Sequence, residues 1–253
     1  MKLKDKVAIV VGGGSGIGRA SATLMAQEGA MVTIADLSIE RADKVADNIK
    51  AMGFEAATMK IDMRKEEDAQ EMVKVTLGKY GKIDILVNVA GGSVGEFIIE
   101  RKEVGTFAES TKDKWDRILD ANLNGPRNCT RAVINHMIER RTGKIINFSS
   151  ITFERGNAGV DYTAAKGGIV GFTRALAREV EPYKIQVNCI TPVGTLSERM
   201  LGAIERHRQA GEEVDLNAYC TPEEVAEAVL FLASAASDHV SGQNIIFGTP
   251  SSP

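Results

Sequence analysis

The sequence predicts an α/β fold: a doubly wound parallel sheet of about seven strands with helices on both faces, Rossmann-like, formed as a single domain over residues 1–253. Short apolar runs rich in β-branched residues alternate with longer amphipathic stretches along the whole chain. No Pro/Ser-rich linker or internal repeat interrupts that alternation. Alternation of this kind is typical of parallel strands joined by right-handed helical crossovers.

The apolar runs are expected to be buried strands, because strands covered by helices on both faces are apolar throughout. In chain order they are Val7–Val11, Met31–Ala35, Ala56–Ile61, Ile83–Val89, Lys144–Phe148, Gln186–Ile190 and Asn244–Phe247. The intervening helices are expected near Gly18–Glu28, Ile39–Met52, Lys65–Lys79, Thr111–Arg140, Tyr162–Val180 and Thr221–Ala233. The last begins with a capping threonine, then Pro222 and two acids, which is a strong start signal.

Composition excludes several classes of function. The chain has 253 residues, 43% hydrophobic and 26% charged, which is typical of a soluble globular protein. A net charge of -3, a pI near 5.8 and only 5% aromatic residues predict neither nucleic acid nor a membrane surface as partner. There is no signal-peptide pattern and no apolar run of bilayer-spanning length, so a cytoplasmic location is expected.

Cysteine and histidine spacing argues against a metal site. The three cysteines, Cys129, Cys189 and Cys220, are widely separated and are expected to be free thiols in a reducing compartment. The three histidines show no ligand spacing, so no metal is predicted.

A glycine-rich loop follows the first expected strand and opens the first helix. Its sequence is Gly12-Gly13-Gly14-Ser15-Gly16-Ile17-Gly18. Glycines there permit a tight turn and let a pyrophosphate approach the backbone, while the helix N-terminus offers free N–H groups. We therefore predict a dinucleotide site that uses Gly12, Ser15, Gly16, Ile17 and Gly18.

Asp36 ends the second strand about twenty residues after this loop, where a carboxylate can accept hydrogen bonds from ribose hydroxyls. A carboxylate there repels a 2′-phosphate, and the next residue is Leu37 rather than a base. The sequence thus favours NAD(H) over NADP(H). Arg41 is expected on the exposed side of the following helix.

Tyr162 and Lys166 are four residues apart and share one helix face. A lysine ammonium beside a phenol favours the phenolate, which can act as a base, and the ammonium keeps further donors for a sugar hydroxyl. The pair predicts acid-base chemistry.

With these motifs in place the chain resembles the short-chain dehydrogenase/reductase family over nearly its whole length. Supporting segments are Asp62-Met63, Asn88-Val89-Ala90-Gly91, Asn122-Leu123-Asn124-Gly125, Asn147-Phe148-Ser149-Ser150 and Pro192-Val193-Gly194-Thr195. The resemblance implies a catalytic group of Asn122, Ser150, Tyr162 and Lys166, in which Asn122 holds a relay water. It also implies that the cofactor is bordered by Asp62, Met63, Asn88, Ala90, Gly91, Pro192, Val193 and Thr195. Family members commonly form tetramers, so a homotetramer is expected.

The choice between Ser149 and Ser150 depends on strand register. Ser149 lies thirteen residues before Tyr162, the family's commonest separation, and Ser150 lies twelve. Successive strand side chains point to opposite faces. The run from Gly143 matches the family strand with Ser150 in the catalytic position, so Ser150 is favoured and Ser149 stays open.

The resemblance implies hydride transfer between NAD(H) and a secondary alcohol or ketone, with Tyr162 as general acid/base. Segments 92–110 and 193–217 are expected to shape the substrate pocket, and a cyclic or hydroxyacyl compound would suit their apolar and basic residues. Two alternatives are an NADPH-dependent 3-oxoacyl-thioester reductase and a catalytically idle nucleotide-binding subunit.

Overall fold

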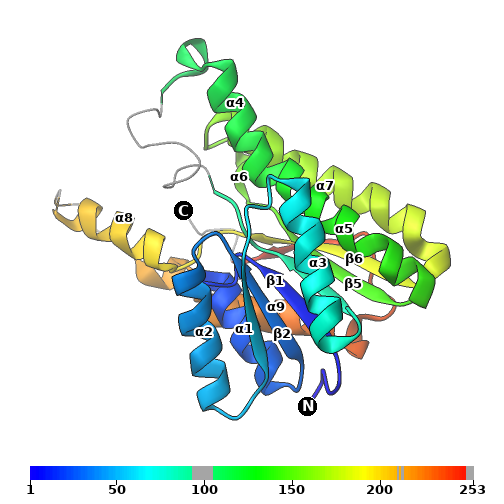
Figure 1. The fold of residues 1–253 in the computed structure, drawn as a ribbon. Helices are drawn as coiled ribbons and strands as arrows, with labels where there is room; N and C mark the ends of the chain where they lie inside the picture. Colours follow the sequence, from blue (N-terminus) through cyan, green and yellow to red (C-terminus); the bar gives the residue numbers. More distant parts are fainter. Residues whose placement is uncertain (93–104, 210, 212–213, 249–253) are drawn as a thin grey trace.

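The computed structural model describes residues 1–92, 105–209, 211 and 214–248 (Figure 1). Its centre is a seven-stranded sheet in the order β3-β2-β1-β4-β5-β6-β7, and every neighbouring pair is parallel. The strands are β1 (Val7–Val11), β2 (Met31–Asp36), β3 (Ala56–Lys60), β4 (Ile85–Asn88), β5 (Gly143–Phe148), β6 (Ile185–Pro192) and β7 (Asn244–Phe247). The predicted doubly wound sheet of seven strands is confirmed.

Two helical layers cover the sheet (Figure 1). One layer contains α1 (Gly16–Gln27), α2 (Ile39–Ala51) and α9 (Pro222–Ala233), and it packs on a core that includes Val10 and Ile34. The other contains α3 (Glu66–Tyr80), α5 (Gly125–Arg140) and α7 (Val160–Val180), which pack on a core that includes Ile9 and Val11. Val10 and its two neighbours thus face opposite layers, because side chains alternate across a strand. This explains why β1 is apolar at every position.

The long helix expected over Thr111–Arg140 is interrupted, which corrects the sequence prediction. α4 (Lys112–Leu119) leads into a π-helical turn over Asp120–Asn124, and α5 follows directly. Pro126, at the start of α5, has no N–H to donate and its ring crowds the carbonyl four residues back. The wider π-helical turn relieves that crowding, and Asn122 lies within this turn.

Two further α-helices among the described residues lie at the carboxyl ends of the strands. They are the short α6 (Thr152–Arg155) and α8 (Glu198–Gln209), and α8 projects from one side of the molecule in Figure 1. Most of the expected pocket segment 92–110, including Phe97-Ile98-Ile99, lies outside the described residues, as does part of segment 193–217.

The three cysteines are free, as expected from their spacing. Burial raises the pKa of Cys129 and of Cys189 to about 12, and burial also raises that of Cys220. None of these thiols is therefore activated as a nucleophile.

Among the described helices, none has both the length and the apolar character that crossing a bilayer requires.

Candidate active site

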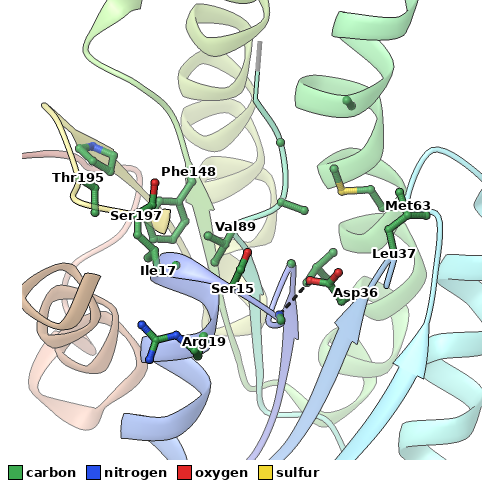
Figure 2. Close-up of a pocket in the computed structure, with 18 of the residues that line it drawn as sticks. Ser15, Ile17, Arg19, Asp36, Leu37, Met63, Val89, Phe148, Thr195 and Ser197 are labelled. Atoms are coloured by element: carbon green, nitrogen blue, oxygen red, sulfur yellow. Dashed lines mark hydrogen bonds between the residues drawn. The ribbon is translucent and has the colours of Figure 1, made fainter. Parts of the chain in front are cut away.

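A cavity of about 1100 Å³ opens at the carboxyl ends of the strands. It lies where the strand order reverses between β1 and β4, the point at which open α/β sheets bind ligands. Figure 2 shows side chains from β2, β5, the glycine loop and the segment after β6 converging on it. Regions far apart in the sequence thus share one cavity.

The glycine loop lines the floor of this cavity through Gly12, Gly14, Ser15, Gly16 and Ile17. Gly12 has a φ of +80°, and a Cβ there would lie 2.8 Å from the backbone of Ala90, so the loops after β1 and β4 touch. Gly18 is outside the lining: a Cβ on it would lie 2.0 Å from the carbonyl oxygen of Gly12. Gly18 therefore packs α1 against the loop, the role expected for one glycine of such a loop.

Asp36 is 6% exposed and is fixed by three donors. Its Oδ2 accepts from the N–H of Gly14 at 2.9 Å, shown dashed in Figure 2. Its Oδ1 accepts from the N–H of Ser38 at 3.0 Å and from Arg41 Nη2 at 3.1 Å. Asp36 and Leu37 both line the cavity.

Arg41 is more than the exposed helix residue that the sequence predicted. Its side chain is 48% exposed, yet its guanidinium pairs with Asp36 and lines the cavity, as does Lys44 one turn later. A cation therefore stands beside the carboxylate that was expected to repel a 2′-phosphate. The two residues are five positions apart across a strand–helix junction, and no regular spacing rule predicts a contact there.

Asp62 and Met63 line the cavity beyond β3. Arg64 holds the Asp62 carboxylate through its Nε at 2.8 Å and its Nη2 at 2.7 Å. The hydrogen bonds from Arg64 lower the pKa of Asp62, so this carboxylate is ionised at neutral pH.

Asn88 lies beneath the cavity and not in its lining, where Val89, Ala90 and Gly91 are found. Its buried amide donates to Asn147 Oδ1 at 2.9 Å and to Thr130 Oγ1 at 3.2 Å. Asn147 in turn donates to Thr173 at 3.0 Å. This network ties β4 and β5 to α5 and α7, so Asn88 fixes the walls of the cavity.

Tyr162 and Lys166 both line the cavity from the first turns of α7. Lys166 is buried; its Nζ donates to the carbonyl oxygen of Phe148 at 3.0 Å and lies 5.6 Å from the Tyr162 ring centroid. An ammonium has three N–H donors, of which this bond uses one. The fixed cation can therefore bind a further oxygen while it stays close to the phenol.

The two serines after β5 differ in how their hydroxyls are used, although both line the cavity. Ser149 is buried, and its Oγ donates to the carbonyl oxygen of Lys166 at 2.7 Å. Within the part of the chain that the structure describes, the Ser150 Oγ accepts from the N–H of Thr152 at 3.5 Å and donates to no group. The Ser150 hydroxyl can donate its proton to a ligand without breaking a structural bond, which supports the choice of Ser150.

Asn122 is fully buried and lies behind the cavity wall, whereas its neighbour Ala121 is in the lining. Its Oδ1 accepts from the N–H of Gly92, and its Nδ2 donates to the carbonyl oxygens of Gly92 and Ile118, each at 2.9 Å. Asn122 therefore anchors the loop that leaves β4 to the π-helical turn.

A buried ion pair beside Tyr162 was not predicted. Lys114 of α4 lies 3.7 Å from Asp161 Oδ2, and both side chains are nearly buried. Asp161 Oδ1 also accepts the N–H of Tyr162 at 2.8 Å. The pair joins α4 to the first turn of α7; the two residues are 47 positions apart, so no local pattern could reveal it.

Pro192, the last residue of β6, lines the cavity together with Val193 and Thr195, which follow it. The Thr195 Oγ1 is buried and has no hydrogen-bond partner among the described residues. Such an atom needs a ligand or water partner. The glycine cradle, the ribose-side carboxylate and this unpaired hydroxyl together fit a dinucleotide. The carboxylate of Glu198, which accepts from the N–H of Gly16 at 3.1 Å, marks an anion position in the same cradle.

Comparison with known proteins agrees with this geometry. A family profile described as short chain dehydrogenase matches residues 6–209. The chain is 35% identical to a 3-oxoacyl-[acyl-carrier-protein] reductase FabG of Thermotoga maritima, with 97% of each chain covered. It is 34% identical to the (2S)-[(R)-hydroxy(phenyl)methyl]succinyl-CoA dehydrogenase subunit BbsD of Thauera aromatica, with 96% and 95% covered. The solved structure of a levodione reductase superposes with a TM-score of 0.88 at 29% identity, over 97% of each chain.

The chain belongs to the short-chain dehydrogenase/reductase family, as its sequence motifs indicated. It is therefore an oxidoreductase of the class that uses a nicotinamide cofactor.

Proposed function

We propose that this protein transfers a hydride between NAD(H) and a secondary alcohol or ketone, with Tyr162 as general acid/base. One observation carries the proposal: Tyr162, Lys166 and Ser150 line the same cavity as the glycine loop and Asp36. A dinucleotide that lay along the loop would bring its reactive ring toward those three side chains.

The protein's part in the reaction follows from its own donors and acceptors. The nicotinamide supplies the hydride acceptor or donor when it is bound. In alcohol oxidation, Tyr162 takes the hydroxyl proton as the carbonyl forms, and Ser150 donates a hydrogen bond to the substrate oxygen. Lys166, held by Phe148, stabilises the phenolate and has donors left for a ribose hydroxyl or water. The Asn122 Oδ1 has a second lone pair with which it could hold the relay water.

Replacement of the tyrosine tests this assignment. In Tyr162→Phe, turnover should fall by about 10²–10⁴-fold, because the proton acceptor is lost. NADH affinity, measured by fluorescence titration, should stay within about twofold, since the ring remains in place. Tyr183→Phe, outside the cavity lining, is the matched control and should keep its turnover. Wild-type turnover in Tyr162→Phe would exclude the role.

The choice of NAD(H) rests on Asp36, whose carboxylate faces the cavity at the position expected for the adenosine ribose. The alternative, NADPH-dependent reduction of a 3-oxoacyl thioester, is favoured by one observation: Arg41 neutralises this carboxylate, and Lys44 lines the cavity beside it. Both cations could hold a 2′-phosphate.

Steady-state assays with both cofactors separate these two proposals. We expect a higher kcat/KM with NAD(H), and Arg41→Gln should change it by less than about threefold. If NADP(H) is preferred and Arg41→Gln removes that preference by roughly tenfold, the loss of about 1.4 kcal/mol identifies a phosphate contact and the alternative is correct.

The substrate is proposed to be a hydroxyacyl or cyclic alcohol. The Thermotoga maritima relative is named for a 3-oxoacyl group, and the Thauera aromatica relative for a hydroxy(phenyl)methyl group on a coenzyme A ester. A cofactor-linked absorbance screen of hydroxyacyl, cyclic, aromatic and steroid alcohols tests this class. Tight NADH binding with no turnover across the screen would instead favour the idle nucleotide-binding subunit. A homotetramer and a cytoplasmic location remain predictions.

A further inference from the structure

The carboxylate of Glu198 contacts the glycine loop from a distant part of the chain. Glu198 is the first residue of α8, and its Oε2 accepts from the N–H of Gly16 at 3.1 Å. Its Oε1 lies 3.6 Å from Arg19 Nε. The preceding Ser197 also approaches the loop: its Cβ would lie 3.4 Å from a Cβ added to Gly16. The segment after β6 is therefore seated on the N-terminus of α1.

The N-terminus of α1 has no local anion or cap of its own. Ser15 is the N-cap residue but makes no side-chain capping bond, and the first turn contains no acid. Free N–H groups and the helix dipole attract negative charge at such a terminus. Glu198, 182 residues away from Gly16, supplies that charge.

The same N–H groups are those with which a dinucleotide pyrophosphate would be bound. We propose that Glu198 is an internal competitor for the pyrophosphate position, so that dinucleotide binding must displace it and release α8 from the loop. This inference rests on the proposed function. In this proposal the Glu198 carboxylate couples the position of α8 to cofactor binding: α8 lies against the glycine loop without the cofactor and is released from it when the cofactor binds.

Arg19 is the second residue on which this proposal depends. It pairs with Glu198 at 3.6 Å and with Glu223 of α9 at 3.4 Å, and it lines the cavity. When Glu198 leaves, Glu223 keeps Arg19 beside the glycine loop, where its charge favours an incoming phosphate. The Glu198 side chain is 60% exposed and that of Arg19 41%, so the contact is weak enough to be displaced.

Binding measurements with Glu198→Gln test the proposal. Loss of the carboxylate should tighten NADH and ADP-ribose by about threefold, because an anion at a helix N-terminus is worth a few-fold in affinity. Adenosine, which carries no phosphate, should bind equally well to both proteins. Glu205→Gln removes the same charge from an exposed position of α8 outside the cavity lining, and it should change none of the three affinities.

Three other outcomes would overturn the proposal, and they are distinguishable. If NADH binds the wild type but binds Glu198→Gln equally or less tightly, Glu198 is no competitor, while the proposed function stands. If adenosine tightens as much as ADP-ribose, the effect does not come from the pyrophosphate position. If the wild type binds no dinucleotide, the proposed function fails and this inference fails with it.

Discussion

The two ends of the sheet offer a matched comparison, since each holds a nearly buried aspartate paired with an arginine. Asp36, at the carboxyl end of β2, is 6% exposed, and Asp84, just before β4 at the amino end, is 5% exposed. Asp84 accepts from the N–H of Val7 at 2.9 Å and from Arg140 Nη2 at 2.9 Å. Asp36 likewise accepts backbone N–H groups and an arginine.

The difference lies in what surrounds each pair. Arg140 also donates to the carbonyl oxygen of Ile83, and Lys82 lies 3.5 Å from Asp84, so this pair joins β4 to β1 and α5 and is no part of the cavity. Arg41 and Asp36 both line the cavity. At the carboxyl ends of parallel strands the loops diverge and leave room for a ligand. The same pair of side chains is thus structural at one end and available for binding at the other.

The largest effect should come from the buried ion pair between Lys114 and Asp161. This pair is structural although it lies beside Tyr162, which lines the cavity. Asp161→Asn, beside Tyr162, leaves the Lys114 ammonium buried without its counter-charge and should lower the free energy of unfolding by about 3 kcal/mol. Turnover should fall as well, because the carboxylate also orients the first turn of α7. Urea denaturation and steady-state kinetics measure the two effects.

Two control variants show whether the loss of stability in Asp161→Asn comes from the unpaired, buried charge of Lys114. Adding Lys114→Met to Asp161→Asn removes the unpaired ammonium and should restore part of the stability. Asp116→Asn breaks the exposed pair with Lys112 and should cost less than about 1 kcal/mol. A double variant no more stable than Asp161→Asn alone would show that the pair is not the source.

The next effect sharpens the comparison at the amino end. Asp84→Asn should lower the free energy of unfolding by about 2 kcal/mol, since a buried, charge-assisted hydrogen bond to Arg140 is lost. That loss corresponds to a melting temperature lower by roughly 6 °C for a chain of this length. Activity per folded molecule should not change. Asp238→Asn, which breaks a half-exposed pair with Lys144, is the control and should have a smaller effect. A reduced kcat in Asp84→Asn would contradict the division between the two ends.

The smallest effect is a pH dependence, also at the amino end. His136 Nε2 accepts from the N–H of Ile83 at 3.1 Å, and burial and Arg140 lower the pKa of this imidazole. The unfolded state therefore binds a proton more readily than the folded state. The contribution of His136 to stability is complete above about pH 6.5 and is lost as the pH falls below that value through the folded pKa.

His136→Gln, which retains a neutral acceptor, should show a smaller drop in melting temperature between about pH 7.5 and pH 5.5 than the wild type. His239→Gln, at an exposed position, should follow the wild type. Equal drops in all three proteins would exclude His136 as the titrating group.

Local patterns in the sequence predicted most of the fold and the outline of the site. The apolar runs identified the strands because a strand covered on both faces is mostly apolar; its buried polar residues, such as Asn88 and Asn147, are hydrogen-bonded to each other. The sequence alone was enough to recognise the glycine loop, Asp36 and the Tyr162–Lys166 spacing. Each of these features depends on residues that are close together in the chain. The prediction of a single long helix over Thr111–Arg140 was wrong. The helical periodicity of the sequence continues through the π-helical turn, and Pro126 is the one local sign of the interruption.

The sequence by itself predicted seven parallel strands, all expected to be buried, a glycine loop for a dinucleotide and an acid-base pair. The seven strands are present, but the edge strands β3 and β7 are only partly buried, because each has a neighbouring strand on one side alone. Only the tertiary structure decided which distant groups meet there: Glu198 on Gly16, Lys114 on Asp161, and the Asn122 amide on Gly92. It also brought Arg41 onto Asp36 across a strand–helix junction. The physical reason is that local spacing fixes backbone conformation and side-chain direction, whereas contacts between separate elements depend on how whole helices pack against the sheet.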